Sequence, residues 1–528
     1  MKHSLTLFFL IAALIPQDVF GQGIVRLSVD VKGVEGNSLS VRPVVSGDGR
    51  YIAFTSAASN LVPMDTNGQA DVFVFDRILG ITTLISKSST GVQGTWGGGN
   101  PAISGDGRFI AFDSQSDNLV SGDANGEFDI FVHDRLTSET TRVSVDSYGA
   151  EGNGYSVFPS ISADGSTVAF ESWARNLVPG DTNAYGDVFV HEMASGITTR
   201  VSVRSSGVEA IGASQFASLS ADGRFVAFHS RADNLVQGDS NRSFDTFLHD
   251  RSSGQTTRVS VSSAGAEGDY GTFAVYAPGI SANGRVVAFS SWATNLVAGD
   301  TNATCDIFVH DRVTGNTSRV SIDSQGLQGN GLSRIPTLSG DGRFVAFDST
   351  ASNLVSGDTN QVNDVFVHDR LSGSTHRVNV DSAGGQGDLE ALDASISGNG
   401  RYVVFESPSS NLVSGDLNGV SDIFLFDQFG PALSKEGTCP GNLTLTVSGG
   451  VIGQNVVLVY GRQGVFVKPG PPCQGIVLDL ANPTFGVTVQ TKLGGVAVVP
   501  LIAPAGACGQ TIQAVDLSTC NVSNPIVL

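Results

Sequence analysis

Positive charge is scarce in this 528-residue chain, which has 30 Lys and Arg residues against 50 Asp and Glu and a net charge of −20. A basic surface that would neutralise nucleic-acid phosphates is therefore missing. Nucleic acid is not an expected partner, and electrostatic attachment to an anionic membrane surface is not expected either.

The chain also lacks the short motifs of common enzyme classes, since it has no Gly-x-Ser-x-Gly, no His-Glu-x-x-His and no phosphate-binding loop. Sustained helical periodicity is missing too, which argues against helical repeats. Hydrophobic residues make up 40% of the chain and include 30 Phe, enough for a large buried core. We therefore predict an all-β protein that is not an enzyme.

Only one long apolar run is present, and it lies at the N-terminus. Lys2 and His3 precede an apolar stretch from Leu5 to Ile15, and a polar stretch ending in Val19-Phe20-Gly21 follows. The run is too short for a membrane span and is typical of a secretory signal peptide. We expect residues 1–21 to be this signal peptide, no membrane span, and a protein exported to the periplasm or the extracellular space.

Cysteine is rare and unevenly placed. Four of the five cysteines fall near the C-terminus, at Cys439, Cys473, Cys508 and Cys520. This distribution predicts two disulfides in an oxidising compartment, with three pairings open. Cys305 is left as a buried free thiol. Because residues 431–528 also contain almost no acidic residues, we expect a small β-sandwich domain there, stapled by the disulfides.

One phrase, of the form Ser-Gly-Asp-Gly-Arg-Phe-Val-Ala-Phe, occurs seven times. Its copies begin at Ser46, Ser104, Ser162, Ser220, Ser281, Ser339 and Ser397, at a constant spacing except for one longer interval between Ser220 and Ser281. A period this long, filled with alternating apolar residues and turn dipeptides, is typical of one four-stranded blade of a β-propeller. In the second repeat we expect a hairpin turn at the Asp-Gly pair, a third strand over Asp129–His133 and a fourth over Thr141–Val145.

The strand count predicts how the ring closes. The fourth-strand phrase first occurs at Arg26-Leu27-Ser28-Val29, before any other element, whereas the last repeat ends at Phe426-Asp427 without one. We expect residues 24–30 to complete the seventh blade, so that no sheet edge stays free. The sequence thus predicts a seven-bladed β-propeller over residues 22–430, followed by the β-sandwich over residues 431–528.

At these residues the chain resembles the WD40-like repeat of TolB-type propellers, whose signature is a Ser-x-Asp-Gly hairpin, an Ala-Phe strand, a polar loop and an Asp-aromatic strand. The resemblance implies a periplasmic or secreted propeller that binds partners and lacks its own chemistry. TolB itself has an additional α/β domain that nothing in this chain matches, so the role of TolB in the cell envelope is not implied.

A second phrase, Asp-x-Asn-x-x-x-Asp, occurs in the long loop of every repeat. Its residues are Asp65, Asn67 and Asp71; Asp123, Asn125 and Asp129; Asp181, Asn183 and Asp187; Asp239, Asn241 and Asp245; Asp300, Asn302 and Asp306; Asp358, Asn360 and Asp364; and Asp416, Asn418 and Asp422. Oxygen ligands at this spacing are what Ca²⁺ favours, and the phrase resembles the calcium loops of integrin-type propellers and EF-hands. The alternative is that Asp and Asn only form Asx-turns, with Asn tolerating a left-handed φ. Ca²⁺ is therefore a candidate cofactor, and both interpretations stay open.

Five histidines occupy one strand position in successive repeats, at His133, His191, His249, His310 and His368. The first and last repeats have Phe75 and Phe426 there. We interpret this position as an aromatic-sized packing slot and not as a ring of metal ligands.

Residues that serve a particular function should break the sevenfold symmetry. The three tryptophans, Trp96, Trp173 and Trp292, lie in loops of one propeller face, and the longest connection between repeats adds Tyr276 to that face. These rings could stack on a sugar or anchor a peptide, and the alternative is that they fill gaps between blades.

These observations predict an exported, non-catalytic propeller that acts as a binding scaffold for protein or glycan. The competing prediction is a propeller-type glycosidase or polysaccharide lyase with carboxylates in the central channel. Inward-facing carboxylates beside a His or Tyr of a single blade would favour the enzyme, and the sequence alone does not identify them.

Overall fold

The structure is a computed structural model that describes residues 23–381 and 384–429 with their side chains, and the backbone of further strands between residues 432 and 527. Every regular element in these residues is a β-strand. Accordingly, no helix of the described chain could cross a membrane. The predicted signal peptide, residues 1–21, lies outside the described residues, and the domain boundaries at residues 22 and 430 stay predictions.

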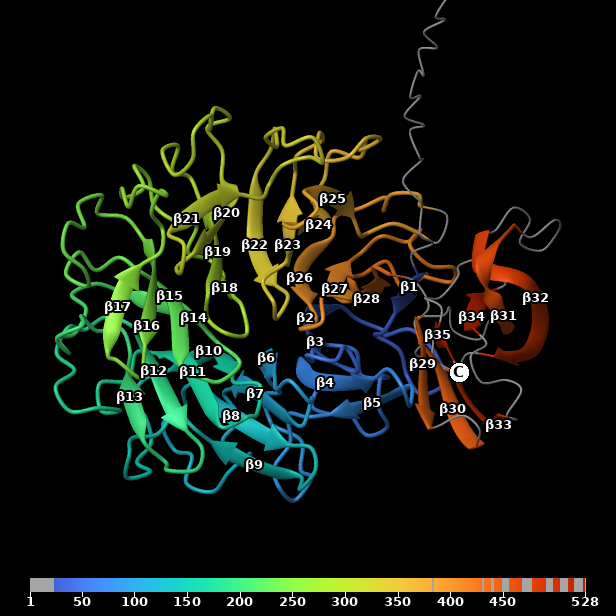
Figure 1. Cartoon of the computed structure of the whole chain (residues 1–528). Helices are drawn as coiled ribbons and strands as arrows, with labels where there is room; N and C mark the ends of the chain where they lie inside the picture. The colour runs from blue at the N-terminus through green and yellow to red at the C-terminus, as the bar shows by residue number, and fades with distance from the viewer. Residues whose placement is uncertain are drawn as a thin grey trace, which may run out of the picture.

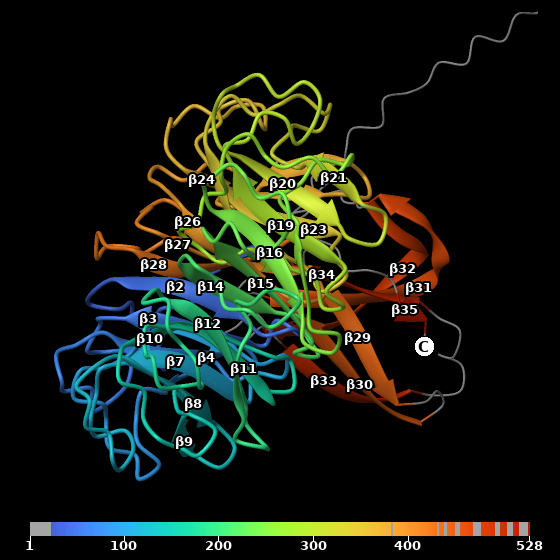
Figure 2. The same cartoon turned by 90° about the vertical axis from the view of Figure 1, so that its left-hand side faces the viewer.

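Seven four-stranded antiparallel sheets are arranged around a central axis as the blades of a propeller (Figure 1; Figure 2). The predicted all-β, seven-bladed architecture is therefore confirmed. Blades one to three are β2 (Ser40–Val45), β3 (Tyr51–Ser56), β4 (Asp71–Asp76) and β5 (Ile81–Leu84); β6 (Gly99–Ile103), β7 (Phe109–Ser114), β8 (Asp129–Asp134) and β9 (Glu139–Arg142); and β10 (Ser156–Ile161), β11 (Thr167–Ser172), β12 (Asp187–Glu192) and β13 (Thr198–Arg200).

The remaining blades follow the same order from the innermost to the outermost strand. Blades four to seven are β14 (Ser214–Leu219), β15 (Phe225–Ser230), β16 (Asp245–Asp250) and β17 (Gln255–Arg258); β18 (Gly279–Ile280), β19 (Val286–Ser291), β20 (Asp306–Asp311) and β21 (Asn316–Arg319); β22 (Ser333–Leu338), β23 (Phe344–Ser349), β24 (Asp364–Asp369) and β25 (Ser374–Arg377); and β26 (Leu392–Ile396), β27 (Tyr402–Ser407), β28 (Asp422–Asp427) and β1 (Gly23–Arg26).

The N-terminal strand closes the ring as predicted, because β1 pairs with β28 of the last blade. Its bounds differ from the expected residues 24–30, and the fourth strand of blade two is likewise Glu139–Arg142 instead of Thr141–Val145. The reason is local. After Arg142 the chain bends, so that the hydroxyl of Ser144 accepts a hydrogen bond from Ile130 N and donates one to Asp129 Oδ1. One backbone bond, from Val143 N to Ile130 O at 2.8 Å, continues beyond the strand, and the Ser144 side chain makes the next contacts.

The hairpin between the first two strands of each blade explains the repeated phrase. In blade one, Asp48 Oδ1 accepts hydrogen bonds from the Ser46 hydroxyl at 2.7 Å and from Arg50 N at 2.9 Å. Gly49 has a φ of +78°, and a Cβ there would lie 2.0 Å from Tyr402 of blade seven. Both the backbone conformation and the contact between blades therefore require glycine.

The same hairpins form a ring of backbone hydrogen bonds about the axis. Each turn donates to the next, in the order Gly47 to Gly105, Ala163, Ala221, Ala282, Gly340 and Gly398, and Asn399 N closes the ring on Gly47 O at 3.2 Å. This end of the axis is the hairpin end. The opposite end, where the long loops begin after β3 and its equivalents, is the loop end.

The core lies between the blades, where every residue of β4 and β8 is buried. The histidine column belongs to this core. His133 is 2% exposed, and its Nδ1 lies 2.9 Å from the Thr140 hydroxyl. The prediction of a packing slot is confirmed, and Cys305 is a buried free thiol as expected.

Beyond the propeller, two further antiparallel sheets are formed by β29 (Ala432–Gly437), β30 (Gly441–Ser448) and β33 (Ala497–Ala503), and by β32 (Val477–Gln490), β31 (Asn455–Val467), β34 (Thr511–Asp516) and β35 (Ile526–Val527). The predicted disulfides lie outside the described residues, since Cys439, Cys473, Cys508 and Cys520 are not among them.

Candidate functional site

The Asp-x-Asn-x-x-x-Asp loops fold as Asx-turns. In blade one, Asn67 Oδ1 accepts a hydrogen bond from Gln69 N at 2.9 Å, and Gly68 between them has a φ of +66°. The equivalent bond is made by Asn125, Asn183, Asn241, Asn302, Asn360 and Asn418. The left-handed conformation, which Asn tolerates, is taken here by the residue after the Asn. This residue is not always glycine, as Ala184 with a φ of +65° shows.

The asparagine amide turns its nitrogen, and not its oxygen, toward the second aspartate. Asn67 Nδ2 donates to Asp71 Oδ2 and to Gly94 O, both at 2.9 Å. Since Oδ1 is already used in the Asx-turn, this Asn presents no free oxygen to a cation.

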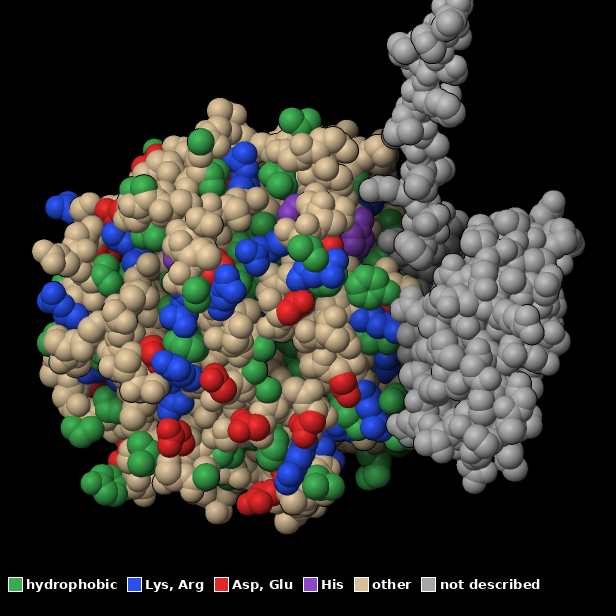
Figure 3. Space-filling model, in the orientation of Figure 1, with side chains coloured by type: hydrophobic (Ala, Val, Ile, Leu, Met, Phe, Trp, Pro, Cys, Tyr) green, Lys and Arg blue, Asp and Glu red, His purple; other side chains and the backbone are tan. Residues whose placement is uncertain are grey.

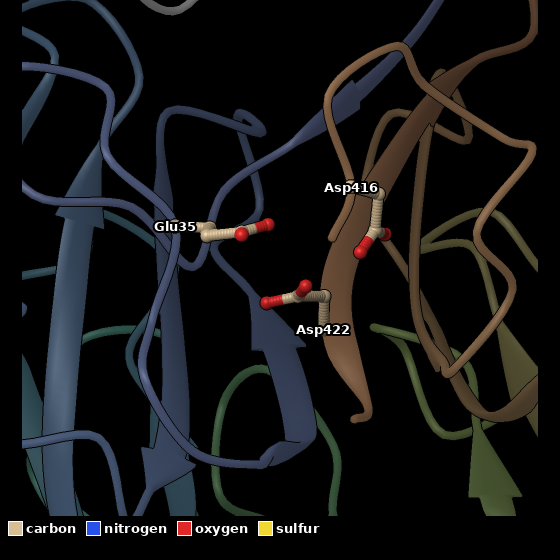
Figure 4. A group of neighbouring side chains, drawn as sticks. All are labelled: Glu35, Asp416 and Asp422. Atoms are coloured by element: carbon tan, nitrogen blue, oxygen red, sulfur yellow. The ribbon is translucent and has the colours of Figure 1, made fainter. Parts of the chain in front are cut away.

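In blade seven the two aspartates of the loop meet a third carboxylate. Glu35, Asp416 and Asp422 turn toward one another in Figure 4, each with a carboxylate oxygen within 4.8 Å of the others. The guanidinium of Arg26 lies among them, with Nη1 at 2.8, 3.3 and 3.5 Å from Glu35, Asp416 and Asp422. A built-in arginine thus sits among the carboxylates.

Five other blades also place an arginine against the two loop aspartates, namely Arg142, Arg200, Arg258, Arg319 and Arg377, whose side chains are 8 to 10% exposed. The third residue is a glutamate in blades two to four and a glutamine, Gln328 or Gln386, in blades five and six. Sequence reasoning missed these arginines because it took the Arg-Val phrase only as a strand. The signal was present, because in each of these five blades an Arg and then a Glu or Gln follow the second Asp of the loop at the same two offsets, as in Asp129, Arg142 and Glu151.

The donor set in these six blades fits a buried arginine and not Ca²⁺. Carboxylates that Ca²⁺ would use already bind Nη1, and the Asn oxygen is taken. Burial raises the pKa of Asp239 in blade four to about 7; the nearby Asp245 and Glu267 add to the rise, and Arg258 opposes it. Calcium binding in the loops as such stays a prediction.

The tryptophans occupy separate places. Trp96, Trp173 and Trp292 are 58%, 40% and 41% exposed. Trp173 stacks on Tyr155 with ring centroids 5.6 Å apart, and its Nε1 donates to Glu171 Oε1 at 3.4 Å. None of the ring contacts found among the described residues joins two tryptophans, so they do not form one aromatic patch.

Tyr276 sits in the longer connection that precedes blade five. The extra residues leave the sheet, so that β18 has two residues where other innermost strands have five or six. His229 holds this turn, since its Nε2 donates to Tyr276 O at 3.1 Å and its Nδ1 lies 3.2 Å from the Thr272 hydroxyl. Burial lowers the pKa of His229 to about 4, and the ring is therefore neutral.

The Tyr276 side chain reaches the axis. Its pKa is raised to about 12 by burial first and then by the charge of Asp393, while Arg42 opposes the rise. Tyr276 belongs to blade five, Asp393 to blade seven and Arg42 to blade one. Because blade five is not a neighbour of blades seven and one in the ring, these charges act on Tyr276 across its centre.

A second contact crosses the axis in the same way. The Arg42 guanidinium of blade one lies 5.9 Å from the ring centroid of Phe158 in blade three, within cation–π range. Phe158 in turn packs on Phe216 of blade four, at 4.8 Å. One side of the axis is thus aromatic, and the other is charged.

One column of the repeat, with a residue in every blade, was not singled out by the sequence analysis. The residue after the Ala-Phe or Val-Phe pair varies among five residue types: Thr55, Asp113, Glu171, His229, Ser290, Asp348 and Glu406. Three of its carboxylates reach the next blade, where Asp113, Asp348 and Glu406 accept hydrogen bonds from the backbone N of Phe158, Asp393 and Arg42 at 3.1, 3.2 and 2.6 Å. These three donors have φ values of +54°, +52° and +55°. Comparing the seven repeats column by column would have found this variation.

We call Arg42, Tyr276, Arg334, Asp348, Asp393 and Glu406 the axial cluster. Asp348 is fully buried, yet its Oδ1 makes no hydrogen bond within the described residues, and neither does the buried Nε of Arg334. Burial raises the pKa of Glu406 to about 7 and that of Asp348 well above its usual value. Unsatisfied buried polar groups are rare, so the axial cluster has capacity to bind a polar ligand. Solvent reaches it through Arg42, which is exposed.

No protein-family model matches the chain, and no curated protein matches it. Solved structures do. TolB from Agrobacterium tumefaciens is 16% identical, covers 53% of this chain and 80% of its own, and has a TM-score of 0.34. TolB from Acinetobacter baumannii is 14% identical over 79% of this chain and 78% of its own, with a TM-score of 0.34, and a prolyl endopeptidase is 13% identical over 83% and 57%, with a TM-score of 0.43. TolB is thus among the structural neighbours, and the seven-bladed fold itself rests on the strand pairing described above.

Proposed function

We propose that this protein is an exported, non-catalytic binding scaffold that holds a protein or glycan partner at the loop end of its propeller axis. The observation that carries the proposal is the axial cluster, in which Glu406 binds Arg42 N, Asp348 binds Asp393 N, and the charges of blades one, six and seven act on Tyr276 of blade five. The seven repeats are otherwise regular. A unique ligand would therefore bind where residues that differ between blades lie close together.

The chemistry of the axis suits a ligand with polar and apolar faces. Phe158 and Phe216 offer aromatic surface, and Arg42, Asp393 and Tyr276 offer donors and acceptors. Pockets for sugars and peptides combine the same two features. The exposed pair of Trp173 and Tyr155 is joined to this region through Glu171, and it would extend the contact to a larger partner.

Surface charge supports a partner recognised by shape and individual contacts. On the face shown in Figure 3, acidic and basic side chains lie interspersed among uncharged ones, and no field of one sign is visible. A polyanion or polycation bound by charge alone does not suit such a face. Export is supported by the N-terminal apolar run, which is typical of a signal peptide.

The test is a binding screen of the mature chain against polysaccharides and secreted or envelope proteins, by calorimetry or surface-based detection. Arg42→Asn is the informative variant, because Asn100 occupies the equivalent place in blade two with a similar φ of +48°. We expect it to weaken binding at least tenfold. Arg108→Ala is the control, since Arg108 pairs with Asp134 near the hairpin end and should leave binding unchanged.

A propeller glycosidase or lyase is the second candidate, and one observation favours it. Burial raises the pKa of Glu171 and of Glu406 to about 7, the range in which a carboxyl group can serve as a general acid. Tyr276 occurs in one blade only, and it lies near Asp393, which is a neighbour of Glu406. Release of reducing ends or unsaturated products from a polysaccharide panel, lost in Glu406→Gln, would replace the scaffold proposal with this one.

A further inference from the structure

Blade one departs from the other six at its outer rim. Leu84 stands where they have the arginine that neutralises the loop aspartates. The described ion pairs give neither Asp65 nor Asp71 a cationic partner. Their neighbours are neutral amides instead, since Gln93 Nε2 donates to Asp65 Oδ1 and to Asp71 Oδ2, both at 2.8 Å.

A pocket of about 770 Å³ lies at this position. Its lining includes the polar residues Thr66, Asn67 and Gln93 and the apolar residues Val62, Leu84 and Val92. In blade two the equivalent of Leu84 is Arg142, which pairs with Glu151, the equivalent of Gln93, while Asn125, the equivalent of Asn67, binds Asp129. The pocket is thus the place that an arginine side chain fills in six blades.

In blade five a glutamine and a guanidinium share the same two aspartates, and there the glutamine makes the hydrogen bonds while the arginine Nη1 makes ion pairs only. There Gln328 Nε2 binds Asp300 Oδ1 at 2.8 Å and Asp306 Oδ2 at 3.1 Å, as Gln93 does in blade one. Arg319 Nη1 nevertheless lies 3.4 and 3.5 Å from the same two aspartates. Blade one has the same acceptors and no arginine.

Met64 is a second, independent departure at the same pocket. Its φ is +69°, a conformation that costs a residue with a side chain about 1 kcal/mol or more. The other blades have glycine there, and the glycine carbonyl accepts from arginine Nη2, as Gly122 O does from Arg142 at 3.1 Å. The Met64 side chain is 86% exposed beside the pocket that it lines. Backbone strain together with an exposed apolar side chain is typical of a binding site.

We propose that blade one binds, in this pocket, an arginine side chain presented by a protein partner. Met64 and Gln93 line the pocket, and the two aspartates lie directly behind Gln93, which binds both of them. The Met64 carbonyl and these carboxylates would serve as the acceptors that the planar guanidinium fork uses in the other blades, and Leu84 and Val62 would cover the alkyl stem. Lys87 also lines the pocket, on the side of blade two, where its charge acts on His133. The site uses none of the axial residues and is independent of the function proposed above.

The bound segment has room to continue toward blade two. A second pocket, of about 480 Å³, shares Val92 with the first and is lined by Asn118, Leu119 and Thr140. Trp96 follows Thr95, a lining residue of the first pocket, and is 58% exposed. An extended peptide anchored by its arginine would therefore meet further contacts along this rim.

The test uses the mature chain and the labelled peptide acetyl-Gly-Gly-Arg-Gly-Gly-amide, with matched peptides that carry citrulline or lysine in place of arginine. We expect saturable binding of the arginine peptide, at least tenfold weaker for the citrulline peptide because the neutral ureido group lacks the charge. Leu84→Arg should abolish binding, since the new side chain fills the pocket as Arg319 does in blade five.

Gln93→Glu is the gain-of-affinity variant, because it gives blade one three carboxylates, as Asp123, Asp129 and Glu151 do in blade two. This variant should bind the arginine peptide several-fold more tightly. Arg42→Asn should leave peptide binding unchanged, which separates this site from the axis. Equal binding by the wild type and a folded Leu84→Arg, equal binding of the citrulline peptide, or no gain in Gln93→Glu would each overturn the proposal.

Discussion

The guanidinium of Arg42 in blade one lies 5.9 Å from the ring of Phe158 in blade three. Blade two stands between them in the ring, so the contact exists only because both side chains reach the axis. Tyr276 and Asp393 repeat this relationship between blades five and seven. Side chains of different repeats come together at the axis, in a combination that no single repeat contains.

Addition of Ca²⁺ distinguishes the two interpretations of the Asp-x-Asn-x-x-x-Asp loops, as Asx-turns or as metal sites. With Arg142→Leu, the buried Asp129 and the half-buried Asp123 and Glu151 are left without a cation, which we expect to cost about 3 kcal/mol of unfolding free energy. Ca²⁺ should then restore part of the thermal midpoint of this variant and leave that of the wild type unchanged relative to EDTA. A large rise for the wild type in Ca²⁺, and not in Mg²⁺, would instead make the loops metal sites.

Glycine at the hairpin turn should be far less replaceable than glycine in the long loop. Gly49→Ala combines a φ of +78° with a Cβ 2.0 Å from Tyr402. We expect this variant to lose about 3 kcal/mol of unfolding free energy. Gly68→Ala is the matched control, because its φ is +66° with no atom within 4 Å. Chemical denaturation of both variants checks the difference, and equal losses would contradict the packing argument.

Acid should destabilise the propeller through its buried histidines. Burial lowers the pKa of His133 and His368 from 6.5 to about 4. The unfolded chain therefore takes up protons first, and stability present at pH 7 is lost as the pH falls through 6.5 toward 4. At pH 5 each histidine costs about 1–2 kcal/mol.

His133→Phe combined with His368→Phe tests this pH dependence, because Phe75 and Phe426 fill the same slot in blades one and seven. Unfolding free energies measured from pH 7 to pH 4.5 should fall less steeply in the double variant than in the wild type. Parallel curves would show that other groups cause the acid sensitivity.

Cys305 should be chemically silent in the folded protein. It is fully buried, and burial raises the pKa of its thiol, so little reactive thiolate forms. Titration with a thiol reagent should detect no reactive thiol at Cys305 in the native state and one after unfolding. Labelling of Cys305 in the native protein would contradict its placement.

The blades and their closure follow from the sequence because they are local. One hairpin phrase and one turn phrase recur at nearly constant spacing, and the position of Arg26 before all other elements predicts where the ring closes. The arginine in the carboxylate cluster was equally periodic. The role of this arginine depends on a contact between two elements. Arg142, at the end of the outermost strand β9, pairs with Asp123 in the loop before the neighbouring strand β8.

The axial cluster could not be predicted from local patterns. Arg42 and Glu406 lie near opposite ends of the propeller sequence, and they meet because the ring closes blade seven on blade one. Tyr276 was selected because its connection is long, but its direction depends on how His229 holds the turn. Periodicity identifies which residues differ between blades, and only the closed ring shows which of them come together.

The most direct test of the axial proposal is the dissociation constant of the tightest partner found in the glycan and protein screen, measured for the wild type, Arg42→Asn and the control Arg108→Ala. We predict at least a tenfold weakening in Arg42→Asn and no change in Arg108→Ala. A screen in which nothing binds, or a partner that binds Arg42→Asn as tightly as the wild type, would contradict the assignment of the axis as the binding site.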